Sequence, residues 1–170
     1  MQSRKEEKHM RERIELFKPT VQARFEPYIS SSDTRNPTGH IFPGKVVIWD
    51  TKAGAYSLLT ENIDLPQEYV AKTAEELNTV IFVMSFEKMP GASYKNVKTG
   101  LYAGQAQQSM YRLKVIDGIS KQCENVTIVG TPPAQVRMKG PGSTVFLDGV
   151  VEADSNIVRW IIGHVRVSRN

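Results

Sequence analysis

TVIFVMSF, residues 79–86, is the stretch that decides the fold of this chain. Apolar side chains occupy consecutive positions in it, so both faces of a strand built from it are apolar. Strands with that pattern lie in the middle of a sheet and are covered on each side by other elements. We therefore expect residues 79–86 to form the central strand of the domain.

Two further stretches share a pattern: a strand-like run that ends in Asp, then a turn, then a second strand-like run. They are GKVVIWDTKAGAYSLL, residues 44–59, and YRLKVIDGISKQCENVTIVG, residues 111–130. The short carboxylate of Asp50 or Asp117 can accept hydrogen bonds from the backbone of the turn that follows it. The pattern predicts two β-hairpins, with residues 55–59 as the second strand of the first hairpin.

Two helices are expected near the ends of the chain. Residues 4–17 are rich in helix formers and carry a narrow apolar stripe of Met10, Ile14 and Phe17. That helix should end before Pro19, because proline removes a backbone donor and crowds the preceding turn. The stripe should pack on this domain or on a partner, and self-association through the helix is equally open.

Near the other end, residues 154–156 can cap a C-terminal helix that covers the sheet. Its apolar face would consist of Ile157, Ile161 and Val165. Between the first hairpin and the central strand, residues 65–71 and 73–77 are typical of short helical turns, with Thr73 as an N-cap.

Together these elements predict an α+β fold. It would have a mainly antiparallel sheet of about four or five strands, a C-terminal helix packed on one face and a charged N-terminal helix. Prolines and a polar run make residues 18–43 an irregular linker. We therefore expect residues 1–40 to hold the charged helix and the linker, and residues 41–170 to form a single α+β domain.

Composition and charge exclude several classes of protein. The 22 basic and 18 acidic residues give a net charge of +4, and the two signs are interleaved along most of the chain. Nucleic-acid binders usually cluster their cations on one element, so nucleic-acid binding is not favoured. The single cysteine, Cys123, excludes an internal disulfide and a multi-cysteine zinc site, and the three histidines lie far apart in sequence. We expect no metal and no cofactor.

The sequence also bears on location. No apolar stretch approaches the ~20 residues that span a bilayer, and the charged start of the chain lacks the apolar segment of a signal peptide. These observations leave the compartment open, and the chain as it stands is expected to be cytoplasmic. The charged helix leaves an alternative open, in which it binds an anionic surface, either nucleic acid or the periphery of a membrane.

A catalytic site can be built from three residues. Asp50 and Asp117 hold equivalent hairpin positions, so they would form a carboxylate pair if the two turns lay side by side. His40 follows a flexible glycine and could act as a general base. These residues make a small hydrolase or transferase an alternative function. The chain contains no G-x-S-x-G motif and no phosphate-binding glycine loop, so catalysis is not the favoured reading.

Two long connections are the better candidates for function. Residues 88–107 and 130–149 are rich in glycine, proline and lysine, which predicts exposed loops, and long loops often carry binding sites. The side chains most suited to a ligand are Tyr94, Lys95, Lys98, Tyr102, Arg137 and Lys139. Tyrosines beside lysines could also stack single-stranded nucleic acid. We favour a non-catalytic binding or scaffolding domain that contacts a protein or small ligand through these loops.

The order of short motifs resembles a family of uncharacterised bacterial proteins. In that family a G-K-x-x-V-x-D strand is followed by L-P, an E-E-x-x-T-V segment, a C-x-V-x-V-x-D strand and a G-x-x-P-P loop. The matching stretches here are GKVVIWD (44–50), LP (65–66), TAEE before TV (73–80), VID (115–117) and GTPP (130–133). Ser109 and Met110 stand where the family has its cysteine. The resemblance implies a shared α+β domain, but it does not imply an activity.

Overall fold

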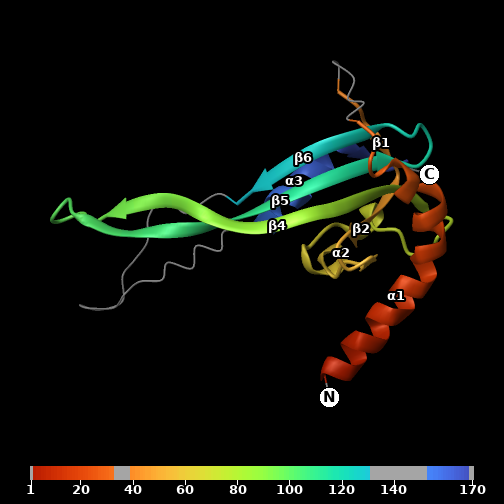
Figure 1. The fold of residues 1–170 in the computed structure, drawn as a ribbon, viewed down its shortest axis with the longest axis horizontal. Helices are drawn as coiled ribbons and strands as arrows, with labels where there is room; N and C mark the ends of the chain where they lie inside the picture. The colour runs from red at the N-terminus through yellow and green to blue at the C-terminus, as the bar shows by residue number, and fades with distance from the viewer. Residues whose placement is uncertain (1, 33–38, 131–152, 169–170) are drawn as a thin grey trace.

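The computed structural model describes residues 2–32, 39–130 and 153–168. Five strands form the main sheet in the order β3-β2-β4-β5-β6 (Figure 1). Strands β2 and β4 are parallel, and the other neighbouring pairs are antiparallel, which confirms the predicted α+β class. The strands of this sheet are β2 (Lys45–Asp50), β3 (Ala55–Tyr56), β4 (Leu77–Lys95), β5 (Tyr102–Asp117) and β6 (Cys123–Val129).

Strand β4 lies at the centre of the sheet, as its apolar sequence predicts. Ile81 and Val83 face one layer of the core, and Val80 and Phe82 face the other. A strand alternates its side chains between two faces, so a run of consecutive apolar residues needs a cover on both. Helices α1 (Gln2–Arg24) and α3 (Ala153–His164) provide these covers.

Helix α3 covers the first face, as predicted. Ile157 and Ile161 are fully buried against apolar residues of β2, β4, β5 and β6. The helix ends at His164, so Val165 does not extend its apolar face as expected. Val165 instead pairs with Phe42 in a separate two-stranded parallel sheet, formed by β1 (Phe42–Pro43) and β7 (Val165–Arg166).

Helix α1 covers the second face, and the prediction that it ends before Pro19 is wrong. Phe17, Val21 and Phe25 recur every four residues and are all fully buried in the second core cluster. Burying each of these side chains contributes about 1.5–3 kcal/mol, which together outweighs the ~3 kcal/mol cost of one proline inside a helix. The second half of α1 therefore belongs to the same core as the sheet, and a boundary at residue 40 does not separate the two.

The short connecting elements differ in part from the prediction. The first hairpin forms, but β3 has only two residues, and the chain then turns into α2 (Leu59–Asn62). Residues 65–71 contain the expected helical turn, η2 (Gln67–Tyr69); another, η1 (Glu26–Tyr28), follows α1. Thr73 does not begin a helix: residues 74–76 are a turn whose Glu76 carboxylate accepts a 2.9 Å hydrogen bond from the backbone of Lys72.

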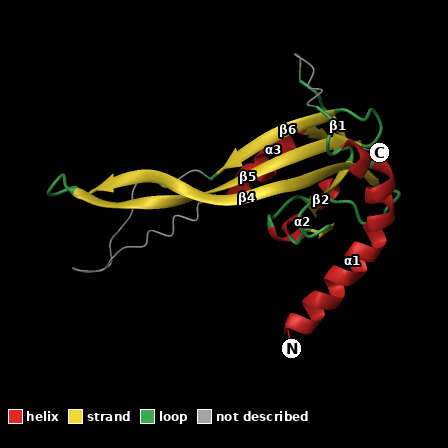
Figure 2. Cartoon of the chain, viewed as in Figure 1, coloured by secondary structure: helices red, strands yellow, loops and turns green. Residues whose placement is uncertain are grey.

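The largest correction concerns residues 88–107, which are two paired strands joined by a short turn at residues 96–101 and not one long loop. Strands β4 and β5 continue past the sheet as a two-stranded ribbon, paired as far as Lys95 and Tyr102 (Figure 2). Register shifts near Pro90 and between Tyr94 and Lys95 accommodate the residues that suggested a loop. We call residues 84–109 the arm, because they project from the body of the molecule.

Candidate binding surface

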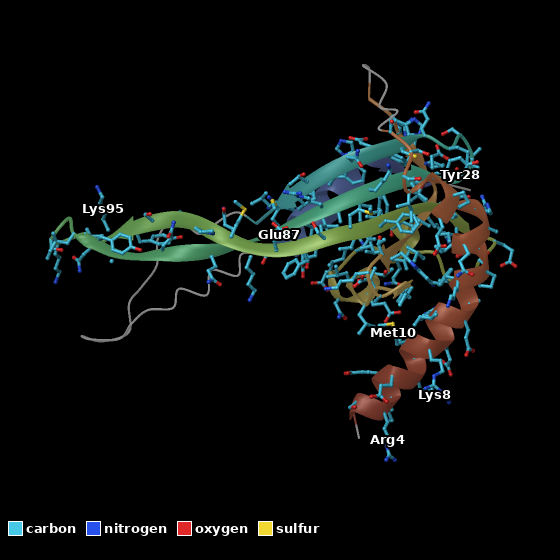
Figure 3. All side chains as sticks on the ribbon, viewed as in Figure 1. Arg4, Lys8, Met10, Tyr28, Glu87 and Lys95 are labelled. Carbon is cyan, nitrogen blue, oxygen red and sulfur yellow. The ribbon has the colours of Figure 1, made fainter. Side chains whose placement is uncertain are left out.

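The arm is built on the two strands that are most deeply held in the sheet. Its partner strands stop at its root: β2 pairs with β4 only as far as Val83, and β6 pairs with β5 only from Met110. Beyond those points, among the described strands, β4 and β5 pair only with each other. Figure 3 shows Glu87 near the root of the arm and Lys95 near its far end.

A tight turn closes the arm. The backbone N–H of Asn96 donates to the carbonyl of Leu101 at 2.8 Å, and the Asn96 side chain accepts from the backbone N–H of Lys98 at 2.8 Å. Gly100 has a φ of +67°, a conformation that favours glycine. These contacts fix the turn, so the side chains around it are presented in a defined arrangement.

The end of the arm, residues 95–102, which we call the tip, exposes apolar side chains beside lysines. Val97, Leu101 and Tyr102 are 99%, 69% and 68% exposed. Lys95 and Lys98 flank Val97 in the sequence and are also exposed. Of the predicted contact residues, Lys95, Lys98 and Tyr102 therefore lie together at the tip, and Tyr94 lies next to it in β4.

Arg137 and Lys139, with residues 131–149 of the second predicted loop, lie outside the described residues. Val97 and Leu101 are exposed apolar residues of the tip that the sequence interpretation missed. Met84 and Phe86 at the root of the arm are also exposed apolar residues that it missed. Their signal in the sequence was a strand pattern that continues past the buried core.

The proposed catalytic residues divide into a pair and a separate residue. His40 Nε2 lies 2.8 Å from Asp117 Oδ2. Asp50 lies apart from this pair. Asp50 is opposite Val83 and Asp117 is opposite Thr79, and these two positions are about 13 Å apart along β4. Strand β5 runs antiparallel to β2, so the Asp residues that end these strands lie at opposite ends of the β4 segment from Thr79 to Val83.

The carboxylate of Asp117 caps the turn between β5 and β6. Its Oδ1 accepts from the backbone N–H groups of Ile119 at 2.7 Å and Ser120 at 3.0 Å, and its Oδ2 accepts from the Ser120 hydroxyl at 2.7 Å. Burial by itself raises the pKa of Asp117, but the hydrogen bonds that the carboxylate accepts outweigh burial and hold the pKa below its ordinary value.

This geometry favours a structural cap over a catalytic group. In a serine triad the histidine stands between the serine and the aspartate, so that it can take the serine proton. Here Asp117 stands between Ser120 and His40, and the serine hydroxyl donates to the carboxylate. His40 also packs edge-on against Phe42, with ring centroids 4.6 Å apart. The cluster ties the segment before β1 to the turn after β5.

A polar groove of about 760 Å³ lies between the C-terminal segment and η2. It is lined by Ile41, Glu68, Tyr69 and residues 162–168, including His164. His164 is already engaged: its Nδ1 is 2.8 Å from the carbonyl of Trp160, and its ring stacks on the Trp160 ring at 4.5 Å. The groove thus combines a constrained histidine with a polar wall, and its residues do not include the predicted catalytic ones.

The outer half of α1 forms another surface. Glu61 in α2 ties this helix to the body, because its carboxylate lies 2.9 Å from His9 Nε2 and 3.5 Å from Arg13 Nε. Arg4 and Lys8 are exposed on the helix, with Lys8 3.8 Å from Glu12. Basic and acidic side chains alternate there, so the helix does not present a stripe of one charge.

Within the described ranges, no group of three or more His, Cys, Asp or Glu side chains could hold a metal ion. No helix in the part of the chain that the structure describes is both long and apolar enough to cross a bilayer.

Comparison with known proteins gives no functional assignment. A scan against protein-family models and searches of curated proteins and of solved structures found no match to this chain. The resemblance to uncharacterised bacterial proteins, drawn from the order of motifs, stays a prediction. Function is therefore inferred from the chain's own side chains.

Proposed function

We propose that this protein is a non-catalytic binding module that presents its arm to a protein partner. The observation that carries the proposal is the exposed apolar tip, with Val97, Leu101 and Tyr102 at the end of a projecting ribbon. An exposed apolar cluster in a structured segment gives the isolated fold little stability, and such clusters mark interaction sites. Tyrosine in particular is enriched at protein interfaces.

The β4 edge of the arm favours recognition through side chains over strand addition. An open strand edge can pair with a foreign strand, and natural proteins guard such edges with bulges, prolines and lysines. Strand β4 has all three in the arm: register shifts after Val83 and Pro90, a proline that lacks an N–H, and Lys88 and Lys95. Strand addition along β4 is therefore disfavoured, and we take the tip as the recognition surface.

The charge of the arm narrows the class of partner. Residues 84–109 contain three lysines and one glutamate. Two of the lysines, Lys95 and Lys98, belong to the tip and lie on either side of Val97 in the sequence. An apolar surface with one or two acidic groups at its margin is the complement of this tip. A protein groove of that kind fits better than a nucleic acid, which would require more cations on the same element.

Shortening the arm tests the proposal. Met89 and Gln108 are directly paired, so replacing residues 90–107 with Asn-Gly closes the hairpin at a natural position. We expect the free energy of unfolding to change by less than about 1 kcal/mol, because the buried residues of β4 lie before residue 84 and those of β5 lie after residue 108. Proteins captured by the tagged full chain from its source cells should be lost.

A matched control is Ile119→Asp in the full chain. Ile119 is an exposed apolar residue in the turn at the other end of β5. This variant should capture the same proteins as the unaltered chain. If the shortened chain also captured them, binding through the arm would be excluded.

A further inference from the structure

A groove beside the outer half of α1 has the properties that the tip requires. Its volume is about 570 Å³, and it is lined by Leu58 together with one side of the helix. The lining residues of the helix are Ser3, Glu6, Glu7, Met10, Arg11 and Ile14. Figure 3 shows Met10 on the side of α1 towards the body and Lys8 on the side away from it.

The groove and the tip are complementary in polarity and in charge. Three apolar side chains, Met10, Ile14 and Leu58, can receive the apolar side chains of the tip. Glu6 and Glu7 stand in the same groove and can pair with the two lysines of the tip, while Arg11 gives the groove one positive charge. Apolar contact supplies affinity at such a site, and the charges select orientation and partner.

We propose that the tip of one copy of this chain docks into the α1 groove of a second copy. This inference rests on the proposed function and names its partner. The occupant is a second copy because the tip cannot reach the groove of its own chain. The strand from Ser85 to Lys95 alone spans roughly 30 Å at about 3.3 Å per residue, and the arm points away from α1 (Figure 1).

A contact of this kind joins two different surfaces, so it does not close on itself in a pair. Each copy keeps one unused tip or one unused groove, and further copies can add head to tail. If the rotation between successive copies closes, the assembly is a ring. If the rotation does not close, the assembly is an open filament. Size that grows with protein concentration is the expected behaviour.

Charge reversal on both surfaces tests the inference with the purified full chain. Sedimentation velocity over a concentration series should show association of the unaltered chain. The tip variant Lys95→Glu/Lys98→Glu and the groove variant Glu6→Lys/Glu7→Lys should each weaken association by about tenfold or more, since two attractive pairs become repulsive. An equimolar mixture of the two variants should associate again, because each tip then meets a groove of opposite charge.

The control variant Arg4→Glu/Lys8→Glu makes the same change of net charge as the tip variant, on helix residues that do not line the groove. It should associate like the unaltered chain. Circular dichroism of every variant checks the fold. An unaltered chain that stays monomeric throughout, or a mixture that fails to restore association, overturns the second-copy inference. Either result leaves the proposed function standing if the full chain captures a different protein and the chain with the shortened arm does not capture it.

Discussion

Phe17→Ala will destabilise the protein by about 3–5 kcal/mol, the cost of removing a fully buried aromatic side chain from a core. The Phe17 ring has no exposed surface, stacks on Tyr56 with centroids 5.9 Å apart, and packs in the core cluster beneath α1. Truncation would leave a cavity between the helix and the sheet. Urea unfolding followed by circular dichroism measures the change.

The control is Leu16→Ala, one residue earlier on the same helix. Leu16 is 40% exposed, so its truncation should cost about 1 kcal/mol or less. A loss below about 1 kcal/mol for Phe17→Ala would mean that α1 is not part of the core. The helix and the residues up to 40 would then be a separate unit, as the sequence alone suggested.

Asp117→Ala has the second largest expected effect, a loss of about 2–4 kcal/mol. The substitution leaves two turn N–H groups and the Ser120 hydroxyl without their acceptor, and it releases His40. Asp50→Ala is the matched control, because Asp50 is half-buried and its carboxylate accepts one solvent-exposed hydrogen bond of 3.0 Å, from the backbone N–H of Ala53. Its loss should be about 1 kcal/mol or less. Equal losses of stability for the two variants would contradict the role of Asp117 as the cap of the turn between β5 and β6.

The same carboxylate makes stability depend on pH. The pKa of Asp117 is lower in the folded protein than in the unfolded chain, so the unfolded chain binds the proton more readily. Its stabilising contribution is therefore complete above the unfolded pKa of about 3.9 and is lost as the pH falls through the lower, folded value. Urea unfolding from pH 6 downwards should show the difference between the unaltered chain and Asp117→Asn shrinking in that acidic window. A difference that stays constant with pH would exclude the lowered pKa of Asp117 as the cause of the pH dependence.

The pattern of apolar residues predicted the body of the fold well. The consecutive apolar residues of β4 required cover on both faces, and α1 and α3 provide it. The prediction of the end of α1 failed at Pro19. Local propensity there competes with the burial of Val21 and Phe25 on the far side of the proline, and burial dominates. The proline is evident in the sequence, whereas the surface that α1 covers is set by the tertiary structure.

The candidate sites were predictable only in part. Lys95, Lys98 and Tyr102 were recognised as exposed, but Pro90 and Gly91 concealed the ribbon that carries them, because bulges let a strand absorb both residues. Pairing of Asp50 with Asp117 failed for another reason. The two hairpins look equivalent in sequence, yet β2 pairs with β4 in parallel and β5 pairs with it antiparallel. Strand direction follows from the whole topology and is absent from either motif.

Photo-crosslinking from the tip tests the central claim most directly. A benzophenone amino acid placed at position 97 of the full chain would react with whatever covers the tip in the source cells, and the same group at position 119 reports on an exposed residue far from it. We predict a discrete crosslinked protein from position 97 that does not form from position 119, identified by mass spectrometry. No product from position 97, or the same products from both positions, would contradict binding through the arm.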